Sequence, residues 1–335
     1  MSDGSRVTLA SIAAEAGVSL ATISKVLNGR PDVATATRDR VEEHLHRHGY
    51  TRRAGATRSE YVELVVHELE SSWTLDLLDG VQSTARAAGR SVVLTISGDR
   101  HSPADEWTEE VLRRRPAGAI LVFSDLAREH REKLGSRGIP FVIVDPSGDP
   151  SPEVPAVGSA NWSGGLLATR HLIELGHRRI AVVSGPPDMM CSLARVDGYR
   201  SAMAAAGLPI SPDWLRYGDF HPAGGERAAR ELLALPEPPT AVFAGSDLQA
   251  LGVLAVAQEL GIRVPQDLSL VGYDDIPVCQ WVNPPLTTVH QPLRLMGEEA
   301  TRMLLRLADG ELPDTTRMDL AVHLVVRGST GAPPD

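Results

Sequence analysis

Cysteine and lysine are the two residue types that this chain of 335 residues nearly lacks. Its only cysteines are Cys191 and Cys279. Two cysteines exclude a disulfide framework and a four-cysteine metal site, and they are typical of a protein in a reducing cytoplasm. Its only lysines are Lys25 and Lys133. Neither follows a glycine and precedes a serine or threonine, so a Walker A phosphate loop is excluded.

Long apolar runs are also missing. The longest, such as residues 251–257, are far shorter than the ~20 residues needed to cross a bilayer. Residues 1–17 lack a basic stretch followed by an apolar one, so we expect no signal peptide. These absences predict a cytoplasmic protein with no membrane partner.

Signatures of catalysis are absent as well. The chain has no Gly-x-Ser-x-Gly, no Gly-x-Gly-x-x-Gly after its first predicted strand, and no His-Glu-x-x-His, since the string at 67–71 ends in serine. Asp274 and Asp275 could form an acid pair, but adjacent side chains usually point apart. His44 and His48 have no third metal ligand at suitable spacing. We therefore predict that the protein is not an enzyme and needs no cofactor and no metal.

Charge is unevenly distributed along the chain, whose net charge is −10. Residues 1–60 carry nine Lys or Arg against seven Asp or Glu, and the remaining residues carry 24 against 36. A small basic head on an acidic body favours a contact between the head and a polyanion.

The head shows three short helical patterns. Apolar spacing predicts a first helix that begins after Thr8, a second over 20–27 and a third over about 36–48. Ser19 is a suitable N-cap for the second helix, and Gly17 permits a left-handed turn before it. The predicted inward residues are Leu9, Ile12, Ala13, Ala16, Val18, Ile23, Val26, Leu27, Val41 and Leu45. Two short helices joined by a glycine turn and braced by a third form a helix-turn-helix.

The outward face of the second predicted helix suits the major groove of DNA. It carries short side chains and one cation, namely Leu20, Ala21, Thr22, Ser24, Lys25 and Asn28. Hydroxyls and the first backbone N–H groups suit phosphate oxygens, while Leu20 and Ala21 are best placed to touch base edges. The same face could instead be the solvated side of an unrelated three-helix domain.

A longer motif favours DNA binding over an unrelated three-helix domain. The string V-T-x-x-x-I-A-x-x-A-G-V-S-x-x-T-x-S-x-V-L-N-G, then V-x-x-x-T-R-x-R-V and a final G-Y, covers over forty residues of the head. It resembles the DNA-binding head of the LacI/GalR family of bacterial transcriptional regulators. The resemblance implies that Leu20 and Ala21 discriminate operators. It also implies that DNA is held by Thr8, Ser19, Ser24, Lys25, Asn28 and Thr37.

The linker over 51–60 departs from the pattern Y-x-P-N-x-x-A-x-x-L of that family. Arg52 and Arg53 replace proline and asparagine, and Gly55 weakens a helix. Ser59 replaces the leucine that enters the minor groove in the family, and serine is a poor wedge. We expect Arg52 and Arg53 to contact phosphates or a narrow minor groove instead.

Beyond the linker, short β-branched runs alternate with helical stretches. The predicted strands are near 62–67, 92–96, 119–123, 141–144, 180–184, 241–244 and 268–272. The predicted helices are near 74–89, 104–115, 126–137, 161–175, 192–206, 223–234, 246–260 and 292–308. This alternation predicts two doubly wound lobes with parallel sheets, and ligands of such folds bind beyond the carboxyl ends of the strands.

The resemblance to the LacI/GalR family extends through the body. The matching strings include Asn161-x-x-Gly-Gly, Arg195-x-x-Gly-Tyr, Phe243-Ala-x-Ser-Asp and Val271-Gly-Tyr-Asp-Asp-Ile-Pro. We therefore expect an α/β protein with a three-helix helix-turn-helix head over 1–50 and a two-lobed, periplasmic-binding-protein-like body over 61–330. Lobe 1 would comprise about 61–158 and 292–318, and lobe 2 about 159–290 and 320–330. Because the family body dimerises, the resemblance also implies a homodimer.

Candidate ligand residues follow from the chemistry of sugars, which offer apolar faces and many hydroxyls. Trp73 and Trp281 lie in predicted loops and could stack on a ligand, or could instead lie at a domain or dimer interface. The other tryptophans, Trp107, Trp162 and Trp214, are expected to pack inside the fold. Asp145 and Asp274 follow predicted strands, and together with Arg195 they suit a neutral polyol. The resemblance implies a cleft lined by Asp145, Arg195, Phe220, Ser246, Asp274 and Gln291.

The sequence thus predicts a DNA-binding transcriptional regulator, expected to be a repressor, whose operator affinity depends on a small effector. The strings His67-Glu-Leu-Glu-Ser-x-Trp73 and Asp274-Asp-Ile-Pro-x-x-x-Trp281 resemble members that respond to plant-derived sugars or oligosaccharides. The alternative effector is a purine or another planar metabolite acting as corepressor, which Trp73 and Phe220 could sandwich.

Overall fold

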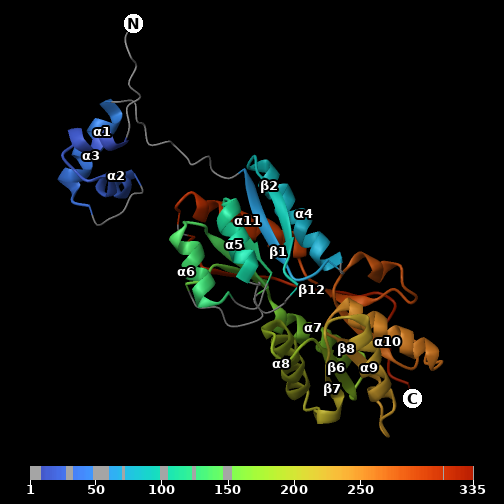
Figure 1. Ribbon diagram of the computed structural model, residues 1–335. Helices are drawn as coiled ribbons and strands as arrows, with labels where there is room; N and C mark the ends of the chain where they lie inside the picture. The colour runs from blue at the N-terminus through green and yellow to red at the C-terminus, as the bar shows by residue number, and fades with distance from the viewer. Residues whose placement is uncertain are drawn as a thin grey trace. The chain divides into compact units, whose positions relative to one another are not determined.

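The computed structural model describes residues 9–27, 33–47, 60–69, 72–98, 105–122, 126–145, 153–311 and 313–334. The chain divides into two units, Met1–Ser59 and Glu60–Asp335, called the head and the body below (Figure 1).

Three helices form the described part of the head: α1 (Leu9–Glu15), α2 (Leu20–Leu27) and α3 (Thr35–Arg47). Ile12, Ile23 and Val41 are fully buried where the three helices meet. Gly17 adopts a φ of +64° in the turn between α1 and α2, a conformation that favours glycine. The Ser19 Oγ accepts a hydrogen bond of 3.1 Å from the main-chain N–H of Thr22 and so caps α2. The predicted helix-turn-helix is confirmed.

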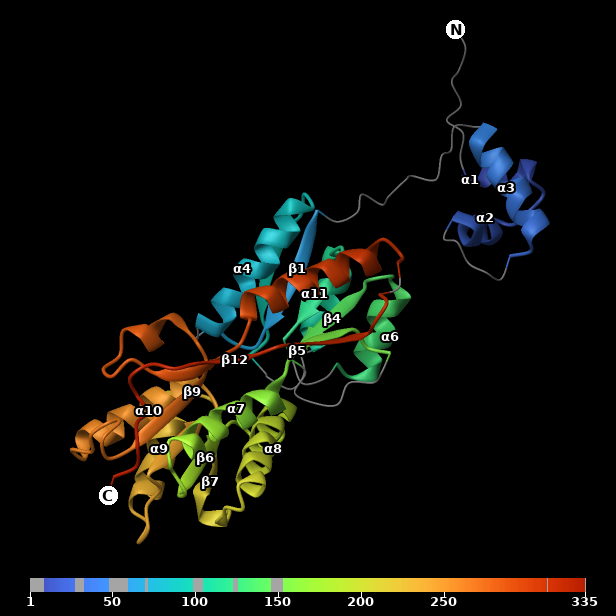
Figure 2. The ribbon, with the colours of Figure 1, turned by 180° about the vertical axis from the view of Figure 1, so that it is seen from behind.

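The first lobe of the body contains a parallel sheet with helices on both faces. Its strands are β1 (Tyr61–Val66), β2 (Ser91–Ile96), β3 (Ala119–Leu121), β4 (Phe141–Val144), β5 (Ala156–Ser159) and β11 (Arg317–Leu320), in the order β11-β5-β4-β3-β1-β2. Its helices are α4 (Ser72–Ala87), α5 (Asp105–Arg114), α6 (Arg128–Ser136) and α11 (Leu293–Ala308). Successive side chains of β1 alternate between the faces: Leu64 packs with α4 and α11, and Val65 packs with α5 and α6. Helices α4 and α11 lie side by side (Figures 1 and 2).

The second lobe repeats this architecture. Its strands are β6 (Ile180–Ser184), β7 (Leu215–Tyr217), β8 (Ala241–Ala244), β9 (Ser269–Asp274), β10 (Thr287–His290) and β12 (His323–Val325), in the order β12-β10-β9-β8-β6-β7. Only the edge strand β12 runs antiparallel to its neighbour. The helices are α7 (Asn161–Glu174), α8 (Met190–Ala205), α9 (Pro222–Leu233) and α10 (Asp247–Glu259), with short 3₁₀ turns η1 (Pro212–Trp214) and η2 (Pro277–Gln280). The core contains the fully buried rings of Tyr199, Phe243 and Tyr273.

The chain crosses between the lobes three times, from β5 to α7, from β10 to α11 and from β11 to β12. All eight predicted body helices are present, with ends that differ from the prediction by at most two residues. Five strands, β5, β7, β10, β11 and β12, were not predicted, because they are short or carry polar and glycine residues among few apolar ones. These strands belong to sheets through pairing with distant segments rather than through their own composition.

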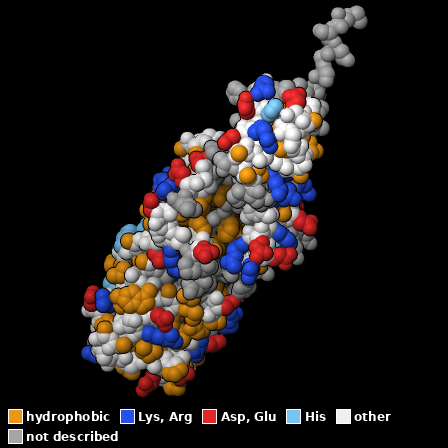
Figure 3. All heavy atoms as spheres, turned by 90° about the vertical axis from the view of Figure 1, so that its left-hand side faces the viewer, with side chains coloured by type: hydrophobic (Ala, Val, Ile, Leu, Met, Phe, Trp, Pro, Cys, Tyr) orange, Lys and Arg blue, Asp and Glu red, His pale blue; other side chains and the backbone are white. Residues whose placement is uncertain are grey.

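None of the described helices combines the length and hydropathy of a membrane span. On the side of the molecule in Figure 3, acidic and basic side chains are interspersed, and hydrophobic side chains gather in the lower half of the body, over the second lobe.

Candidate functional site

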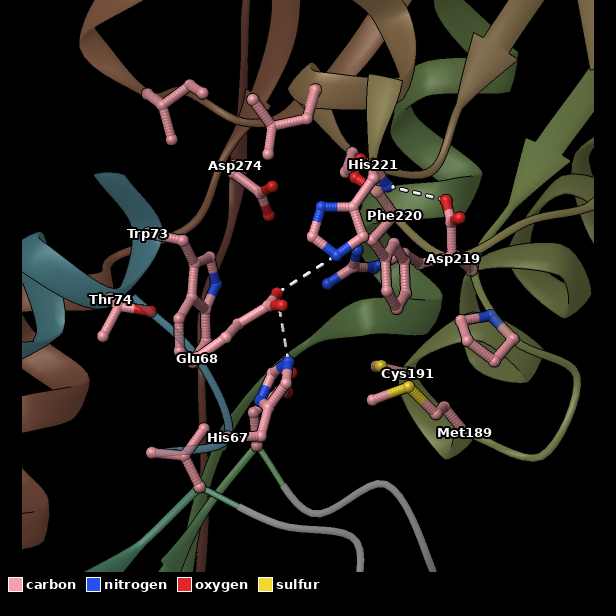
Figure 4. Close-up of a pocket in the computed structure, with 17 residues that line it drawn as sticks. His67, Glu68, Trp73, Thr74, Met189, Cys191, Asp219, Phe220, His221 and Asp274 are labelled. Carbon is pink, nitrogen blue, oxygen red and sulfur yellow. Dashed lines mark hydrogen bonds and ion pairs between the residues drawn. The ribbon is translucent and has the colours of Figure 1, made fainter. Parts of the chain in front are cut away.

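A cleft lies between the two lobes of the body, where the carboxyl ends of strands from both sheets meet. Its open space, which includes solvent at its mouth, is about 930 Å³. The described lining residues are His67, Glu68, Trp73, Thr74, Val122, Asp145, Pro186, Met189, Cys191, Arg195, Asp219, Phe220, His221, Ser246, Leu248, Asp274 and Ile276. Figure 4 shows how the side chains from the two lobes face one another. This is the position at which doubly wound folds bind ligands.

Three cleft residues hold the main chain in the left-handed region. Their φ angles are +49° at Asp145, +68° at Phe220 and +115° at Asp274. Such angles cost a non-glycine residue on the order of 1–3 kcal/mol, and they persist where the surrounding structure imposes them. The sharp turns at Asp145 directly after β4, at Phe220 between β7 and α9, and at Asp274 at the end of β9 therefore indicate a site with fixed geometry.

Arg195 on α8 is the centre of a buried polar network. Its Nε donates to the Oδ1 of Asn161 at 2.8 Å, and its Nη1 donates to the carbonyl of Gly245. Its Nη2 lies 3.5 Å from the Oε1 of Gln291. The guanidinium carbon is 3.7 Å from the centroid of the Tyr273 ring, a favourable cation–π distance. These contacts fix the guanidinium and leave it few N–H groups for a ligand.

The position of Arg195 depends on a close contact between α7 and α8. A Cβ atom added at Gly165 would lie 2.1 Å from the carbonyl oxygen of Arg195, and one at Gly198 would lie 2.1 Å from that of Trp162. Side chains at these glycines would separate the two helices. The glycines of both family-like strings are thus explained by packing.

Carboxyl groups dominate the electrostatics of the cleft. Burial raises the pKa of Asp145 and of Asp274, and the guanidinium of Arg195 opposes both shifts. Repulsion from Asp247 and Asp145 raises the pKa of Asp274 further. Behind the cleft, Asp247 accepts a hydrogen bond of 2.6 Å from the Thr288 hydroxyl, and burial raises its pKa to about 6. The cleft is therefore rich in acceptors and contains a single arginine among its described lining residues.

Glu68 forms a bridge between the lobes. Its Oε1 lies 3.2 Å from the Nε2 of His67 and 3.1 Å from the Nε2 of His221 (Figure 4). Glu68 and His67 follow β1 in the first lobe, whereas His221 precedes α9 in the second. The sequence analysis did not assign these residues to the site. For His67 and Glu68 the signal was their position at the end of the first predicted strand, together with the family-like string that begins at His67.

The structure brings Trp73, Asp145, Arg195, Phe220 and Asp274 together on the lining of the cleft. It places Trp73 in the first turn of α4, so the prediction that this tryptophan lies in a loop is wrong.

Three other predicted ligand residues have different surroundings. The Ser246 hydroxyl lines the cleft, but it donates to the carbonyl of Phe220 and accepts from the Gln249 N–H, so it caps α10. Gln291 is not among the lining residues and lies behind Arg195. Trp281 is 83 % exposed and is also not among them.

The remaining tryptophans and Asp275 differ in their surroundings. Trp107 and Trp214 are buried as predicted. Trp162 is 47 % exposed on α7, so the expectation that it packs inside the fold is wrong. Asp274 faces the cleft, whereas Asp275 pairs with Arg327 at 2.6 Å, so the two carboxylates point apart.

In the head, α2 carries the predicted DNA-contacting residues on its exposed side. Leu20 is 55 % exposed, Ala21 and Lys25 are exposed, and Thr22 is half-buried. Ser19 before α2 is exposed, and Thr37 in α3 is half-buried. Four predicted contacts, Thr8, Asn28, Arg52 and Arg53, and the side chain of Ser24 lie outside the described residues.

Similarity to known proteins identifies the family of this chain. Residues 8–53 match the family described as "Bacterial regulatory proteins, lacI family", and residues 169–330 match "Periplasmic binding protein-like domain". The chain is 38 % identical to the HTH-type transcriptional regulator CelR of Thermobifida fusca, over 97 % of this chain and 98 % of that protein. The chain belongs to the lacI family of bacterial regulatory proteins.

Further relatives of this lacI-family protein are also regulators. It is 32 % identical to the HTH-type transcriptional repressor CytR of Escherichia coli K12, over 98 % of this chain and 97 % of CytR. It is also 32 % identical to the repressor PurR of Vibrio parahaemolyticus, over 96 % and 98 % of the two chains. These relatives are transcriptional regulators and not enzymes.

Solved structures give the same fold. A CelR–cellobiose complex matches with a TM-score of 0.74 and 36 % identity, over 97 % of this chain and all of that chain. The lac repressor dimer bound to operator and the anti-inducer ONPF matches with a TM-score of 0.71 and 28 % identity, over 97 % and 99 % of the chains. The lacI-family chain is thus a DNA-binding transcriptional repressor with a ligand-binding body.

Proposed function

We propose that a plant-derived sugar or oligosaccharide binds in the cleft between the lobes and controls the affinity of this repressor for its operator. The observation that carries the proposal is the pairing of aromatic rings with carboxylates. Figure 4 shows Trp73 and Phe220 to either side of the Glu68 carboxylate, with Asp274 facing the same space. The C–H face of a sugar ring packs on an aromatic ring, and its hydroxyls donate to carboxylates.

The charge balance of the cleft favours a neutral ligand over an anionic one. Four carboxylates line it, those of Glu68, Asp145, Asp219 and Asp274. The buried Arg195 already donates to protein acceptors, so it offers little compensation to a phosphate. A ligand that supplies many hydroxyl donors and no negative charge fits this lining. The solved complex of the relative CelR with cellobiose supports the same class of ligand.

We further propose that the protein acts as a homodimer in the cytoplasm. Two heads related by two-fold symmetry would read a roughly palindromic operator, and the lac repressor to which this chain is similar binds its operator as a dimer. The ligand would change the angle between the lobes and thereby the spacing of the heads. If the ligand weakens operator binding, then operator DNA must weaken ligand binding by the same factor.

The DNA contacts are part of the proposal. Leu20 and Ala21 would read base edges, and Arg52 and Arg53 would contact phosphates or a narrow minor groove. The other residues that would hold DNA are Thr8, Ser19, Thr22, Ser24, Lys25, Asn28 and Thr37. The exposure of Leu20 on α2 supports this assignment, because a large apolar side chain exposed on a short helix suits contact with a thymine methyl.

Titration calorimetry with glucose and with cellobiose, xylobiose and mannobiose tests the effector. The same titration with adenine, guanine and hypoxanthine tests the alternative, a purine corepressor between Trp73 and Phe220. Operator affinity is then measured by fluorescence anisotropy with and without the ligand that binds. Binding of a disaccharide with a change in operator affinity is the expected result. Binding of a nucleobase and of no sugar would replace the sugar effector by the purine.

A further inference from the structure

A second cavity borders the effector cleft on the side where the chain crosses between the lobes. Its open space, which includes solvent at its mouth, is about 740 Å³. It lies between the crossover from β5 to α7, the first turns of α8, and β11. Asp145 and Cys191 line both cavities, so the two spaces share a wall.

Two apolar side chains stand at this second cavity with much of their surface exposed. Trp162, the second residue of α7, is 47 % exposed, and Met190, the first residue of α8, is 41 % exposed. The main chain at Trp162 is held against α8, because Gly198 leaves no room for a Cβ atom next to its carbonyl oxygen. The indole is thus carried by a fixed helix and remains open to a ligand, as a stacking platform requires.

Polar groups of both lobes line the same cavity as Trp162. Arg317 and Asp319 on β11 pair at 3.3 Å and are about half exposed. The Nδ2 of Asn161 donates to the Oδ1 of Asp145 at 3.3 Å on the shared wall. An aromatic face beside paired donors and acceptors is the combination that recognises a sugar unit.

We propose that this second cavity is a subsite for an additional sugar unit of an oligosaccharide whose other end occupies the cleft. Trp162 stacks on the additional unit, and Arg317 and Asp319 bind its hydroxyls. Asp145, on the wall shared by the two cavities, contacts both the sugar unit in the cleft and the additional sugar unit. The proposal rests on the sugar effector proposed above and adds to it that the repressor senses the length of the saccharide.

The test is a series of saccharides of increasing length. Calorimetry is performed on the full-length protein with the disaccharide that binds best and with its trisaccharide and tetrasaccharide homologues. For the unaltered protein we expect affinity to rise about tenfold from disaccharide to trisaccharide, the gain that stacking on one aromatic ring can supply. The gain should level off at the tetrasaccharide.

Three variants connect this gain to the subsite. Trp162→Ala should abolish the gain and leave disaccharide affinity within twofold of the original, whereas Trp162→Phe should restore part of the gain. Trp281→Ala removes an exposed tryptophan outside both cavities and should keep the whole gain. Melting temperatures of all three verify that they fold.

The outcomes separate the two proposals. If the disaccharide binds but longer chains bind no tighter, or if the gain survives in Trp162→Ala, the subsite is overturned and the sugar effector stands. If no saccharide binds, the sugar effector is overturned and the subsite with it.

Discussion

Replacing Asp274 by asparagine should weaken effector binding and stabilise the effector-free protein at neutral pH. The Asp274→Asn change keeps the size of the side chain and one oxygen acceptor, and it removes the charge. A hydrogen bond to a charged group contributes about 1.5–3 kcal/mol, and one between neutral groups about 0.5–1.5 kcal/mol. Loss of about 1–2 kcal/mol corresponds to a Kd that is about 5- to 30-fold higher.

The effect on stability follows from the raised pKa of Asp274. Burial places this pKa above the value of about 3.9 that the residue has in the unfolded chain. Between these two values the folded protein holds a proton that the unfolded chain has released, so stability falls as the pH rises through this window. The Asp274→Asn variant has no such proton. Its melting temperature relative to that of the original protein should therefore rise as the pH is raised from pH 4.

Calorimetry and thermal melting between pH 4 and pH 8 measure the two effects. Asp275→Asn is the matched control, because Asp275 is paired with Arg327 and His290 outside the cleft. It should lower the melting temperature and preserve effector affinity. Operator affinity without effector should be unchanged in both variants. Unchanged effector affinity in Asp274→Asn, or a relative melting temperature that falls as the pH rises, would refute the reasoning.

Three further changes address the DNA face and the bridge between the lobes. Lys25→Ala should weaken operator binding and reduce the slope of log K against log salt by about one, which a salt titration measures, and an unchanged slope would remove Lys25 from the phosphate contacts. Leu20→Ala should change which operator sequences are selected from a random library, while effector affinity stays the same. Glu68→Gln should lower effector affinity by up to about fivefold, since its partly exposed ion pair with His221 contributes up to about 1 kcal/mol. Equal affinity with and without the Glu68 charge would show that the bridge does not contribute to effector affinity.

The sequence was most informative where structure is set locally. The cap at Ser19, the glycine turn and the apolar spacing of α2 are properties of adjacent residues, and the bounds of α2 agree with the prediction. The body helices were found for the same reason. Asp145 and Asp274 were placed correctly at the cleft because their strands are apolar and end abruptly.

Features that depend on distant segments were missed or misplaced. Strands β5 and β11 pair with each other across more than 150 residues of sequence, and neither is apolar enough to be recognised alone. The ion pair between Glu68 and His221 joins the two lobes, so no local sequence pattern predicts it. Trp281 looked like a stacking residue because tryptophan is rarely left in solvent, and only the path of the chain after η2 shows that it is exposed.

The three crossings between the lobes have a consequence for how the chain is made. The first sheet gains its edge strand β11 and the second its edge strand β12 only when residues 317–325 are synthesised. Until then, the ribosome-bound chain carries the head helices α1, α2 and α3 together with two sheets that each expose an unpaired neighbour, β5 and β10. Unpaired strands are prone to aggregation and to degradation. A prematurely terminated product would therefore be less stable than the full chain, and cellular proteases remove unstable chains, so it would not persist as a DNA-binding fragment that ignores the effector.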